Sequence, residues 1–185
     1  VTHLVRLCFS KADAVLDECR MLLDSGVKEI TLLGQNVNRY GRLEGEVRFP
    51  ELLRRVHELP GLQRMGFMTS HPSGVDDDLV ACYRDLPKLT PYLHLPIQSG
   101  SDRLLERMNR GYSFQHYRNC WQQLSKARPG LMLSTDIIVG FSGETEQDFE
   151  ATLAAAEEIR WGMAYVFKYN PRPGTKAATW PDDVP

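Results

Sequence analysis

The sequence predicts an α/β protein in which helices cover an open parallel sheet. One observation is a set of five short apolar runs, each followed by glycine, amide or hydroxyl residues: 28–33, 65–68, 92–97, 131–139 and 163–168. A second observation is that stretches of helical period separate these runs. Strict alternation of strands and helices implies right-handed crossovers and a parallel sheet. We therefore expect a site at the carboxyl edge of that sheet.

The stretches between the runs place apolar residues three and four positions apart, which predicts five main helices: 13–25, 51–59, 76–85, 112–127 and 145–160. A shorter helix follows the third run, where Ser101 or Asp102 can cap its positive end. Residues 1–7 can form one more strand, because their apolar side chains favour it. Residues 41–49, rich in glycine and glutamate, are the best candidate for a flexible insertion.

Length and charge limit the classes of function. The 185 residues suit one domain with a substantial core. A net charge of −2 and a pI near 6.2 give no bulk attraction to nucleic acid or to an anionic membrane. No apolar run approaches the ~20 residues that span a bilayer, and no signal-peptide pattern opens the chain. We expect a protein of the cytoplasm or an organellar matrix that is not secreted.

The four cysteines show no paired spacing such as C-x-x-C. They are Cys8, Cys19, Cys82 and Cys120. Three of them fall within helical patterns, which predicts buried thiols that behave as small hydrophobic groups. Cys8 lies near an irregular terminus and its role is undetermined. The pattern favours a reducing compartment and predicts no metal site within this chain.

The residues that follow the five runs resemble, in order and spacing, those of the radical S-adenosylmethionine (SAM) methylthiotransferases. The motifs are LGQNVN at 33–38, TSHP at 69–72, HLPIQSGSD at 94–102 with MNRGY at 108–112, DIIVGFSGET at 136–145 and YNPRPGT at 169–175. They are most similar to the branch that acts on tRNA and makes 2-methylthio-N6-isopentenyladenosine. The resemblance extends from about residue 13 to residue 185.

This resemblance implies one radical SAM core domain over residues 1–185, an open, partial (β/α) barrel of six strands. It also implies SAM as cofactor and tRNA as partner. In the family, a C-x-x-x-C-x-x-C loop holds a [4Fe–4S] cluster that cleaves SAM to a 5′-deoxyadenosyl radical, and a second cluster carries the sulfur. That loop is absent from this sequence. The family's amino-terminal cluster domain and carboxyl-terminal RNA-binding module are not matched either.

The first two motifs supply half of the candidate site. Gly34 allows close approach of the backbone, and Gln35 and Asn36 offer amide donors and acceptors. By resemblance these three lie near the methionine group of SAM. Ser70 and His71 contact cofactor or substrate, or else cap the turn before a proline. No second histidine or carboxylate stands at a metal-ligand spacing from His71.

The later motifs supply the other half. Gln98, Ser99 and Asp136 are candidates for contact with SAM hydroxyls or the target nucleotide. The carboxylate of Asp136 could instead only fix neighbouring backbone amides. Gly140 belongs to a glycine-rich motif that meets adenine in radical SAM enzymes. Arg172, between two prolines, suits the SAM carboxylate or a tRNA phosphate, or else faces solvent.

Two further features are interpreted as structural. His94 precedes the expected rim, which favours a packed, hydrogen-bonded histidine. The fourth helical unit carries a moderately basic set that solvation alone can explain: Arg103, Arg107, Arg110, Arg118 and Arg128.

Three functional hypotheses follow. The first is the barrel part of a tRNA methylthiotransferase that is inactive without its cluster loop. The second is a cluster-less relic that binds SAM, RNA or a protein partner without catalysis. The third, a generic barrel enzyme using acid–base chemistry, is disfavoured because no phosphate loop or nucleophile elbow accompanies the candidate residues.

Overall fold

The computed structural model describes residues 2–7, 11–41, 46–68, 70–181 and 183–184. Cys8 and residues 42–45 of the expected insertion lie outside this range.

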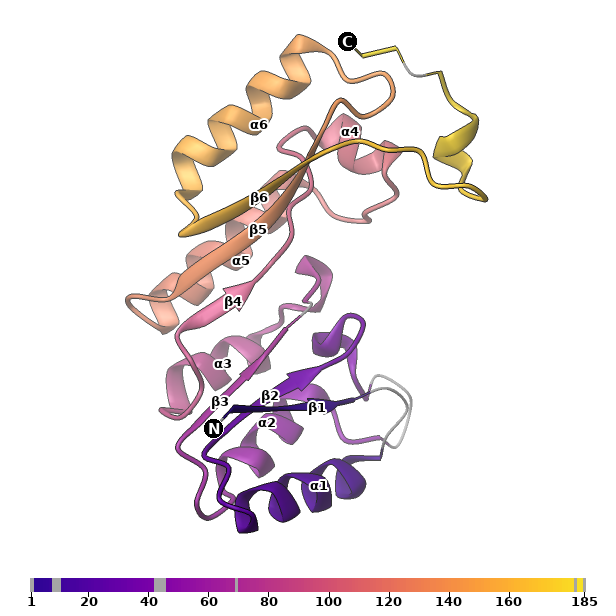
Figure 1. Cartoon of the computed structure of the whole chain (residues 1–185). Coiled ribbons are helices and arrows are strands. Elements are labelled where there is room, and N and C mark those ends of the chain that lie inside the picture. The colour runs from indigo at the N-terminus through magenta and orange to yellow at the C-terminus, as the bar shows by residue number, and fades with distance from the viewer. Residues whose placement is uncertain (1, 8–10, 42–45, 69, 182, 185) are drawn as a thin grey trace.

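Within the described residues, six strands run parallel in chain order. Their bounds are β1 (Thr2–Arg6), β2 (Glu29–Leu33), β3 (Arg64–Phe67), β4 (Tyr92–His94), β5 (Met132–Val139) and β6 (Met163–Lys168). They form two parallel three-stranded ladders, β1-β2-β3 and β4-β5-β6. The segment before β4 joins the ladders, because Met65 donates to the Lys88 carbonyl and Thr90 donates to the Met65 carbonyl, both at 2.8 Å. The result is a strongly curved open sheet whose carboxyl ends lie on the right of Figure 1.

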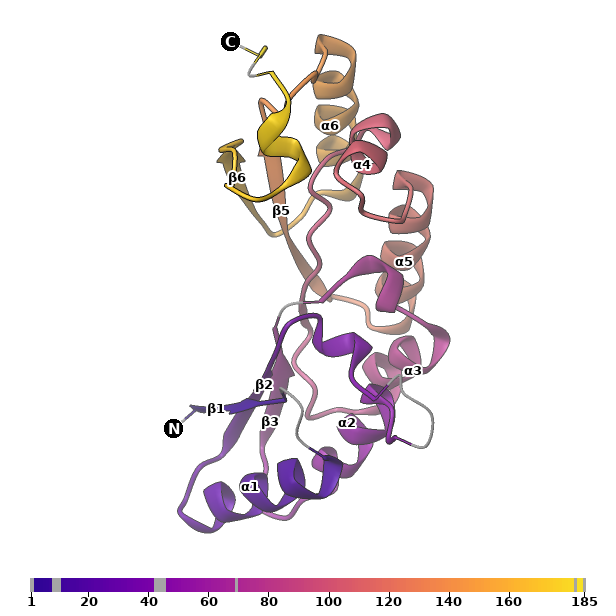
Figure 2. The same ribbon diagram turned by 90° about the vertical axis from the view of Figure 1, so that its right-hand side faces the viewer.

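The described part of the chain has six α-helices, which alternate with the strands and lie along one face of the sheet, as Figure 2 shows. They are α1 (Ala12–Asp24), α2 (Phe49–His57), α3 (Asp77–Asp85), α4 (Asp102–Arg107), α5 (Phe114–Ala127) and α6 (Glu146–Ile159). Short 3₁₀ turns follow three strands: η1 (Val37–Arg39), η2 (Pro72–Gly74) and η3 (Lys176–Thr179). Ser101 caps α4, as the sequence allowed, and Thr145 begins α6 with a full capping box. The opposite face of the sheet stays open.

The predicted strands and helices are confirmed, and the additional strand at the start of the chain is β1. One boundary differs. The run 92–97 is regular only to His94, because Pro96 has no N–H to donate. Pairing with β5 resumes at Gln98, whose N–H donates to the Asp136 carbonyl and whose carbonyl accepts from Ile138, both at 2.8 Å.

The core fills the space between the sheet and the helices. Leu32, Leu53 and Leu93 are among the side chains with no exposed surface. The three described cysteines, Cys19, Cys82 and Cys120, are also buried there, which confirms the prediction of buried thiols. Burial raises the pKa of each thiol to about 11. Within the described part of the chain, no helix combines the length and apolar character needed to cross a bilayer.

Candidate functional site

A cleft of about 1440 Å³ opens at the carboxyl ends of β4, β5 and β6. Gln98 and Asp136 line its floor, α4 lines one side, and the segment after β6 with η3 lines the other. Arg172 and Trp180 come from that last segment. Three sequence-predicted site residues, Gln98, Asp136 and Arg172, therefore meet in one cleft.

Gln98 holds an unusual backbone conformation on the floor of the cleft. Its φ is +74°, in the left-handed region that residues other than glycine rarely adopt. Ladder hydrogen bonds to Asp136 and from Ile138 hold it there. Only 7% of the residue is exposed. Such local strain persists where surrounding structure enforces it, and it concentrates at ligand sites.

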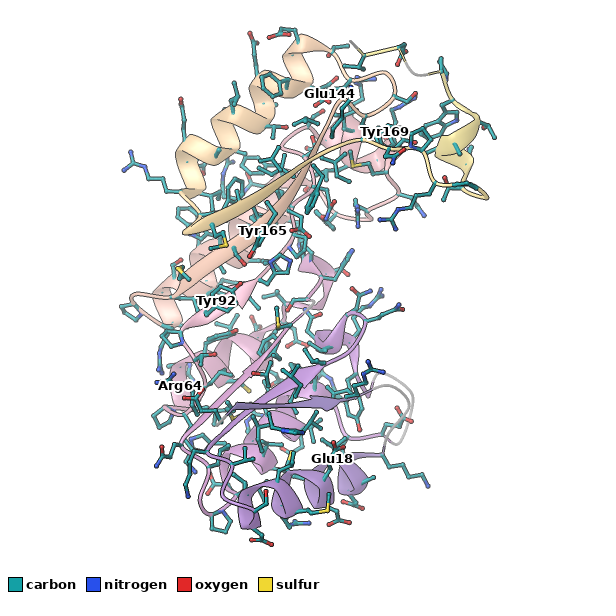
Figure 3. The ribbon with its side chains drawn as sticks, viewed as in Figure 1. Glu18, Arg64, Tyr92, Glu144, Tyr165 and Tyr169 are labelled. Carbon is teal, nitrogen blue, oxygen red and sulfur yellow. The ribbon has the colours of Figure 1, made fainter. Side chains whose placement is uncertain are left out.

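Asp136 projects from the open face of β5 and leaves 28% of its side chain exposed to the cleft. Its Oδ2 lies 3.4 Å from the Nε2 of His94. On the same face, His94 also meets the ring edge of Tyr165 on β6, with 6.3 Å between ring centroids. Figure 3 labels Tyr165 on β6 and Tyr92 on β4, with β5 between the two strands. His94 is packed and hydrogen-bonded, as expected, but it borders the cleft floor.

An aromatic cluster holds the segment after β6 against the rim. Phe141 meets the rings of Tyr169 and Trp180 edge-on, with centroids 4.7 and 5.9 Å away. The guanidinium of Arg107 on α4 stacks over Trp180 at 4.5 Å. The Gly143 N–H donates to Asp183 at 2.7 Å. Sequence reasoning missed Trp180, because a single tryptophan beyond the last strand carries no periodic signal.

The cleft is electropositive. Its lining carries six cationic side chains, Arg103, Arg107, Arg110, Lys168, Arg172 and Lys176, against two acidic ones, Glu106 and Asp136. Two members of the predicted basic set lie elsewhere. Arg118 pairs with Glu158 at 2.6 Å, and Arg128 donates to backbone carbonyls. A local excess of positive charge attracts anionic groups even though the whole chain is slightly acidic.

The candidate residues after β2 and β3 do not line this cleft. Gly34 packs against Val37, Gln35 is exposed, and Asn36 adopts a left-handed conformation with φ of +52° before η1. They lie at the carboxyl end of β2, beside the open face of the first ladder.

His71 and Ser70 follow β3. The His71 backbone is clamped by the side-chain amide of Asn38, through contacts of 2.8 and 3.0 Å. Its ring Nδ1 accepts from Ser73 N–H at the start of η2, which is the capping arrangement that the sequence left open. The Ser70 hydroxyl is buried and has no hydrogen-bond partner among the residues that the structure describes.

Ser99 and Gly140 differ in position from Gln98. Ser99 is fully buried, and its hydroxyl lies 3.3 Å from that of Thr152 on α6, away from the cleft. Because its hydroxyl faces the helix layer, we assign Ser99 a structural role.

Gly140 has a φ of +71°, and its N–H donates to the carboxylate of Glu144 in the turn after β5. Burial raises the pKa of Glu144, and the backbone N–H groups of Gly140 and Phe141, which donate to its carboxylate, partly oppose that rise.

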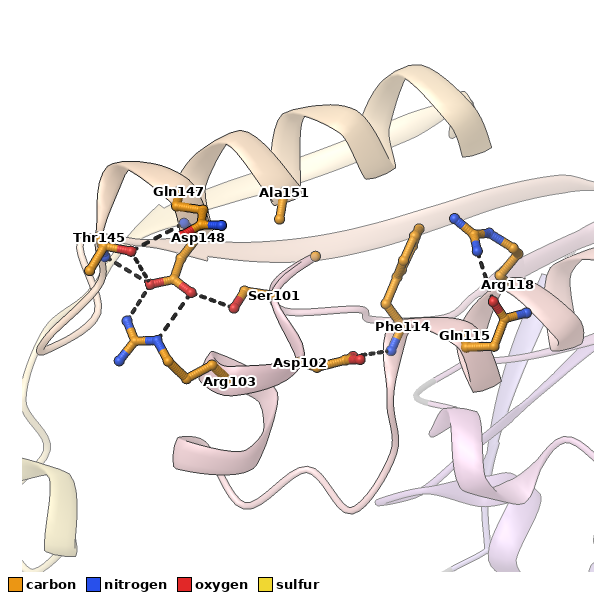
Figure 4. A pocket seen from close by; sticks show the side chains of 11 residues that line it. Ser101, Asp102, Arg103, Phe114, Gln115, Arg118, Thr145, Gln147, Asp148 and Ala151 are labelled. Atoms are coloured by element: carbon orange, nitrogen blue, oxygen red, sulfur yellow. Dashed lines mark hydrogen bonds and ion pairs between the residues drawn. The ribbon is translucent and has the colours of Figure 1, made fainter.

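A second pocket of about 700 Å³ lies among α4, α5 and α6, on the helical side (Figure 4). Its central group is the carboxylate of Asp148, which pairs with Arg103 and accepts hydrogen bonds from Ser101 at 2.5 Å and from Thr145. The Arg103 guanidinium holds the pKa of Asp148 well below its usual range. Because these polar groups satisfy one another, the pocket is interpreted as a structural junction.

The described cysteines do not fit a [4Fe–4S] cluster. Such a cluster needs three thiolates that converge on it. Cys19, Cys82 and Cys120 lie on three different helices, each buried in the core. Over the described residues, no group of three histidine, cysteine or acidic side chains is placed to hold a metal ion.

Comparison with known sequences identifies close relatives. The chain is 55% identical over 174 residues to a tRNA-2-methylthio-N(6)-dimethylallyladenosine synthase from Neisseria gonorrhoeae, which covers 92% of this chain and 39% of that protein. It is 49% identical over 175 residues to the synthase of the same name from Geobacter sulfurreducens, covering 94% of this chain and 39% of that protein. The chain thus spans about two fifths of the length of these relatives.

Solved structures of low sequence identity share the fold. A radical S-adenosylmethionine methyltransferase from Kitasatospora setae, solved with cobalamin and a [4Fe–4S] cluster, has a TM-score of 0.71 at 18% identity, covering 91% of this chain and 33% of that one. Coproporphyrinogen III oxidase from Escherichia coli has a TM-score of 0.61 at 17% identity, covering 96% and 46%. The family model of the radical SAM superfamily matches residues 9–156. On these grounds the chain belongs to the radical SAM superfamily.

Proposed function

We propose that this chain is the barrel part of a tRNA methylthiotransferase, which adds a methylthio group to C2 of an N6-isopentenyl-type adenosine. The identity of 49–55% with synthases of that activity, over more than nine tenths of the chain, supports the substrate class. The cleft that gathers Gln98, Asp136 and Arg172 carries the proposal structurally. A role in tRNA modification places the protein where tRNA is found, in the cytoplasm or an organellar matrix.

The cleft suits two ligands at once. Sites for one small molecule commonly measure about 300–1,000 Å³, and this cleft is larger, at about 1440 Å³. We propose that SAM and the target adenosine share it. The Asp136 carboxylate accepts hydrogen bonds from ribose hydroxyls, and the Gln98 amide both donates and accepts. Arg172 pairs through its planar guanidinium with a carboxylate or phosphate.

The other rim candidates extend the proposed site toward the first ladder. Gly34, Gln35 and Asn36 follow β2, and Ser70 and His71 follow β3. Because carboxyl ends of neighbouring parallel strands share one edge, these residues suit the methionine end of SAM. Gly140, in the turn after β5, is proposed to lie near adenine.

The residues of this chain support binding and orientation. Since the described thiols do not fit a cluster, no radical step is assigned to them. For the chain taken alone, this observation favours the second hypothesis, a cluster-less module that binds SAM, RNA or a protein partner without catalysis. In the complete enzyme the cleft would position both reactants and exclude water, where a misplacement of ~1 Å can lower the rate about a hundredfold.

Titration calorimetry with SAM tests this proposal. Asp136→Asn should raise the Kd of the chain for SAM roughly tenfold or more, since a hydrogen bond to a charged group contributes about 1.5–3 kcal/mol. Gln98→Ala should raise the Kd about two- to tenfold, since a hydrogen bond between neutral groups contributes about 0.5–1.5 kcal/mol. Matched controls are Asp17→Asn on α1 and Gln122→Ala on α5, both on exposed helix positions. If the chain fails to bind SAM, or if the cleft variants bind as the controls do, the proposed site is wrong.

A further inference from the structure

A row of polar side chains crosses the open face of β4 and β5 and ends at the cleft. The Tyr92 hydroxyl lies 2.7 Å from the Ser134 hydroxyl, and the same Ser134 oxygen lies 2.8 Å from the Nδ1 of His94. The other ring nitrogen of His94 lies 3.4 Å from the Asp136 carboxylate. The register that pairs His94 with Ser134 brings the four groups into line. Figure 3 marks the starting point, Tyr92.

The donors in this row are consistent with one arrangement. An ionised carboxylate only accepts, so the nitrogen of His94 that faces Asp136 must carry the proton. In the neutral ring, Nδ1 then accepts the hydroxyl proton of Ser134. The Ser134 oxygen in turn accepts from Tyr92. Each proton has one acceptor, and the opposite tautomer would direct a nitrogen lone pair at the negative charge.

The row is buried at its middle, at Ser134, and open to the cleft at Asp136. Ser134 has no exposed surface, and the His94 side chain is 16% exposed. Asp136 retains 28% exposure in the cleft. Among the described residues, His94 is the one basic side chain within ion-pair distance of Asp136. One carboxylate oxygen thus faces the imidazole, and the other remains available to a ligand.

We propose that His94 is a positioning residue for Asp136: the Ser134 hydroxyl, held by Tyr92, fixes the imidazole tautomer, and the imidazole fixes the carboxylate for a ligand hydroxyl. This inference rests on the proposed function of the cleft. It assigns a role to a side chain that sequence reasoning interpreted as packing alone. Contacts of this kind are often longer without ligand and shorten when ligand binds.

Two substitutions at one position separate this role from packing. His94→Gln places an N–H donor near the position of Nε2 and keeps the contact with Asp136. His94→Asn places its amide near Nδ1, keeps the contact with Ser134 and loses Asp136. We expect His94→Gln to bind SAM within about threefold of the wild type and His94→Asn to bind roughly tenfold more weakly. Thermal melts of both variants report any loss of folding.

A double-mutant cycle shows whether His94 acts through Asp136. In the Asp136→Asn background, His94→Asn should weaken SAM binding by less than about twofold, because the group that it positions is already altered. Equal losses in both backgrounds, or equal losses for His94→Gln and His94→Asn, would overturn the proposal.

The tautomer supplies a test that does not depend on SAM binding. Two-bond ¹H–¹⁵N correlation spectra of the histidine rings, with the His94 signals assigned by their loss in His94→Asn, should show the Nε2–H form at neutral pH. The Nδ1–H form would refute the pairing with Asp136. Failure of the wild type to bind SAM, with the Nε2–H form present, would instead count against the proposed function of the cleft and leave the His94–Asp136 pairing supported.

Discussion

At position 98, the glycine variant should be more stable than the alanine variant. This is the reverse of the usual order within helices and strands, where glycine is the less stable of the two. Both substitutions remove the same buried amide and Cγ methylene, so that loss cancels in the comparison between them, and glycine differs from alanine only by the missing Cβ. What remains is the backbone. At a φ of +74°, a residue with a Cβ is strained by about 1–2 kcal/mol, and glycine is not.

The expected difference follows directly. Gln98→Gly should exceed Gln98→Ala in unfolding free energy by about 1 kcal/mol, after allowing for the greater chain entropy of unfolded glycine. In a domain of this size the difference corresponds to a gap of roughly 2–4 °C in Tm. Both variants should lose affinity for SAM to a similar extent, because both lack the side-chain amide.

Urea unfolding and calorimetry on the same preparations provide the measurement. A matched pair at Gln122, an exposed position within α5, serves as control. There alanine should be the more stable by about 1 kcal/mol. If Gln98→Ala proved as stable as Gln98→Gly or more so, the left-handed conformation of the cleft floor would be refuted.

The remaining predictions concern the helical junction and the thiols. Asp148→Asn should lower the free energy of unfolding at pH 7 by about 1–3 kcal/mol. The loss is no larger because solvent screens the ion pair with Arg103, which is half exposed. The Asp148 pKa is depressed in the folded state, so the stability difference between wild type and Asp148→Asn should be complete above the unfolded pKa of ~3.9 and should shrink as the pH falls below it. Unfolding curves measured from pH 2 to 7 test this, and a stability difference that stays constant with pH would contradict it. Cys19, Cys82 and Cys120, with pKa values raised to about 11, should react with a disulfide reagent only after unfolding, and fast reaction of the native chain would show accessible thiols. Anaerobic reconstitution with iron and sulfide should yield no stoichiometric [4Fe–4S] cluster. A full complement of four irons per chain together with SAM cleavage would show that one of the cysteines was wrongly excluded as a ligand.

The secondary structure was predictable because its signals are local. Apolar alternation marked five strands, and caps such as Thr145 marked where helices begin. The strand at residues 2–6 was harder, since its pairing with β2 is a tertiary contact. The early end of β4 was also missed, although Pro96 was visible, because the sequence does not show whether pairing stops there or merely skips a residue.

The site was predictable in part. Position after a strand brought Gln98, Asp136 and Arg172 to one cleft. That rule did not distinguish Ser99, which side-chain alternation along the strand places on the helix side with Leu93 and Leu95, opposite Gln98. The contribution of His94 was missed because alternation identifies the open face of a strand but not the partner across it.

The central claim is that the cleft at the carboxyl ends of β4, β5 and β6 binds SAM. A crystal structure of this chain with S-adenosylhomocysteine, the stable demethylated analogue, tests it most directly. The account predicts the ribose beside Asp136 and Gln98, in the cleft walled by Trp180. A ligand bound in the pocket among α4, α5 and α6, or one that leaves Asp136 and Gln98 without contact, would contradict it.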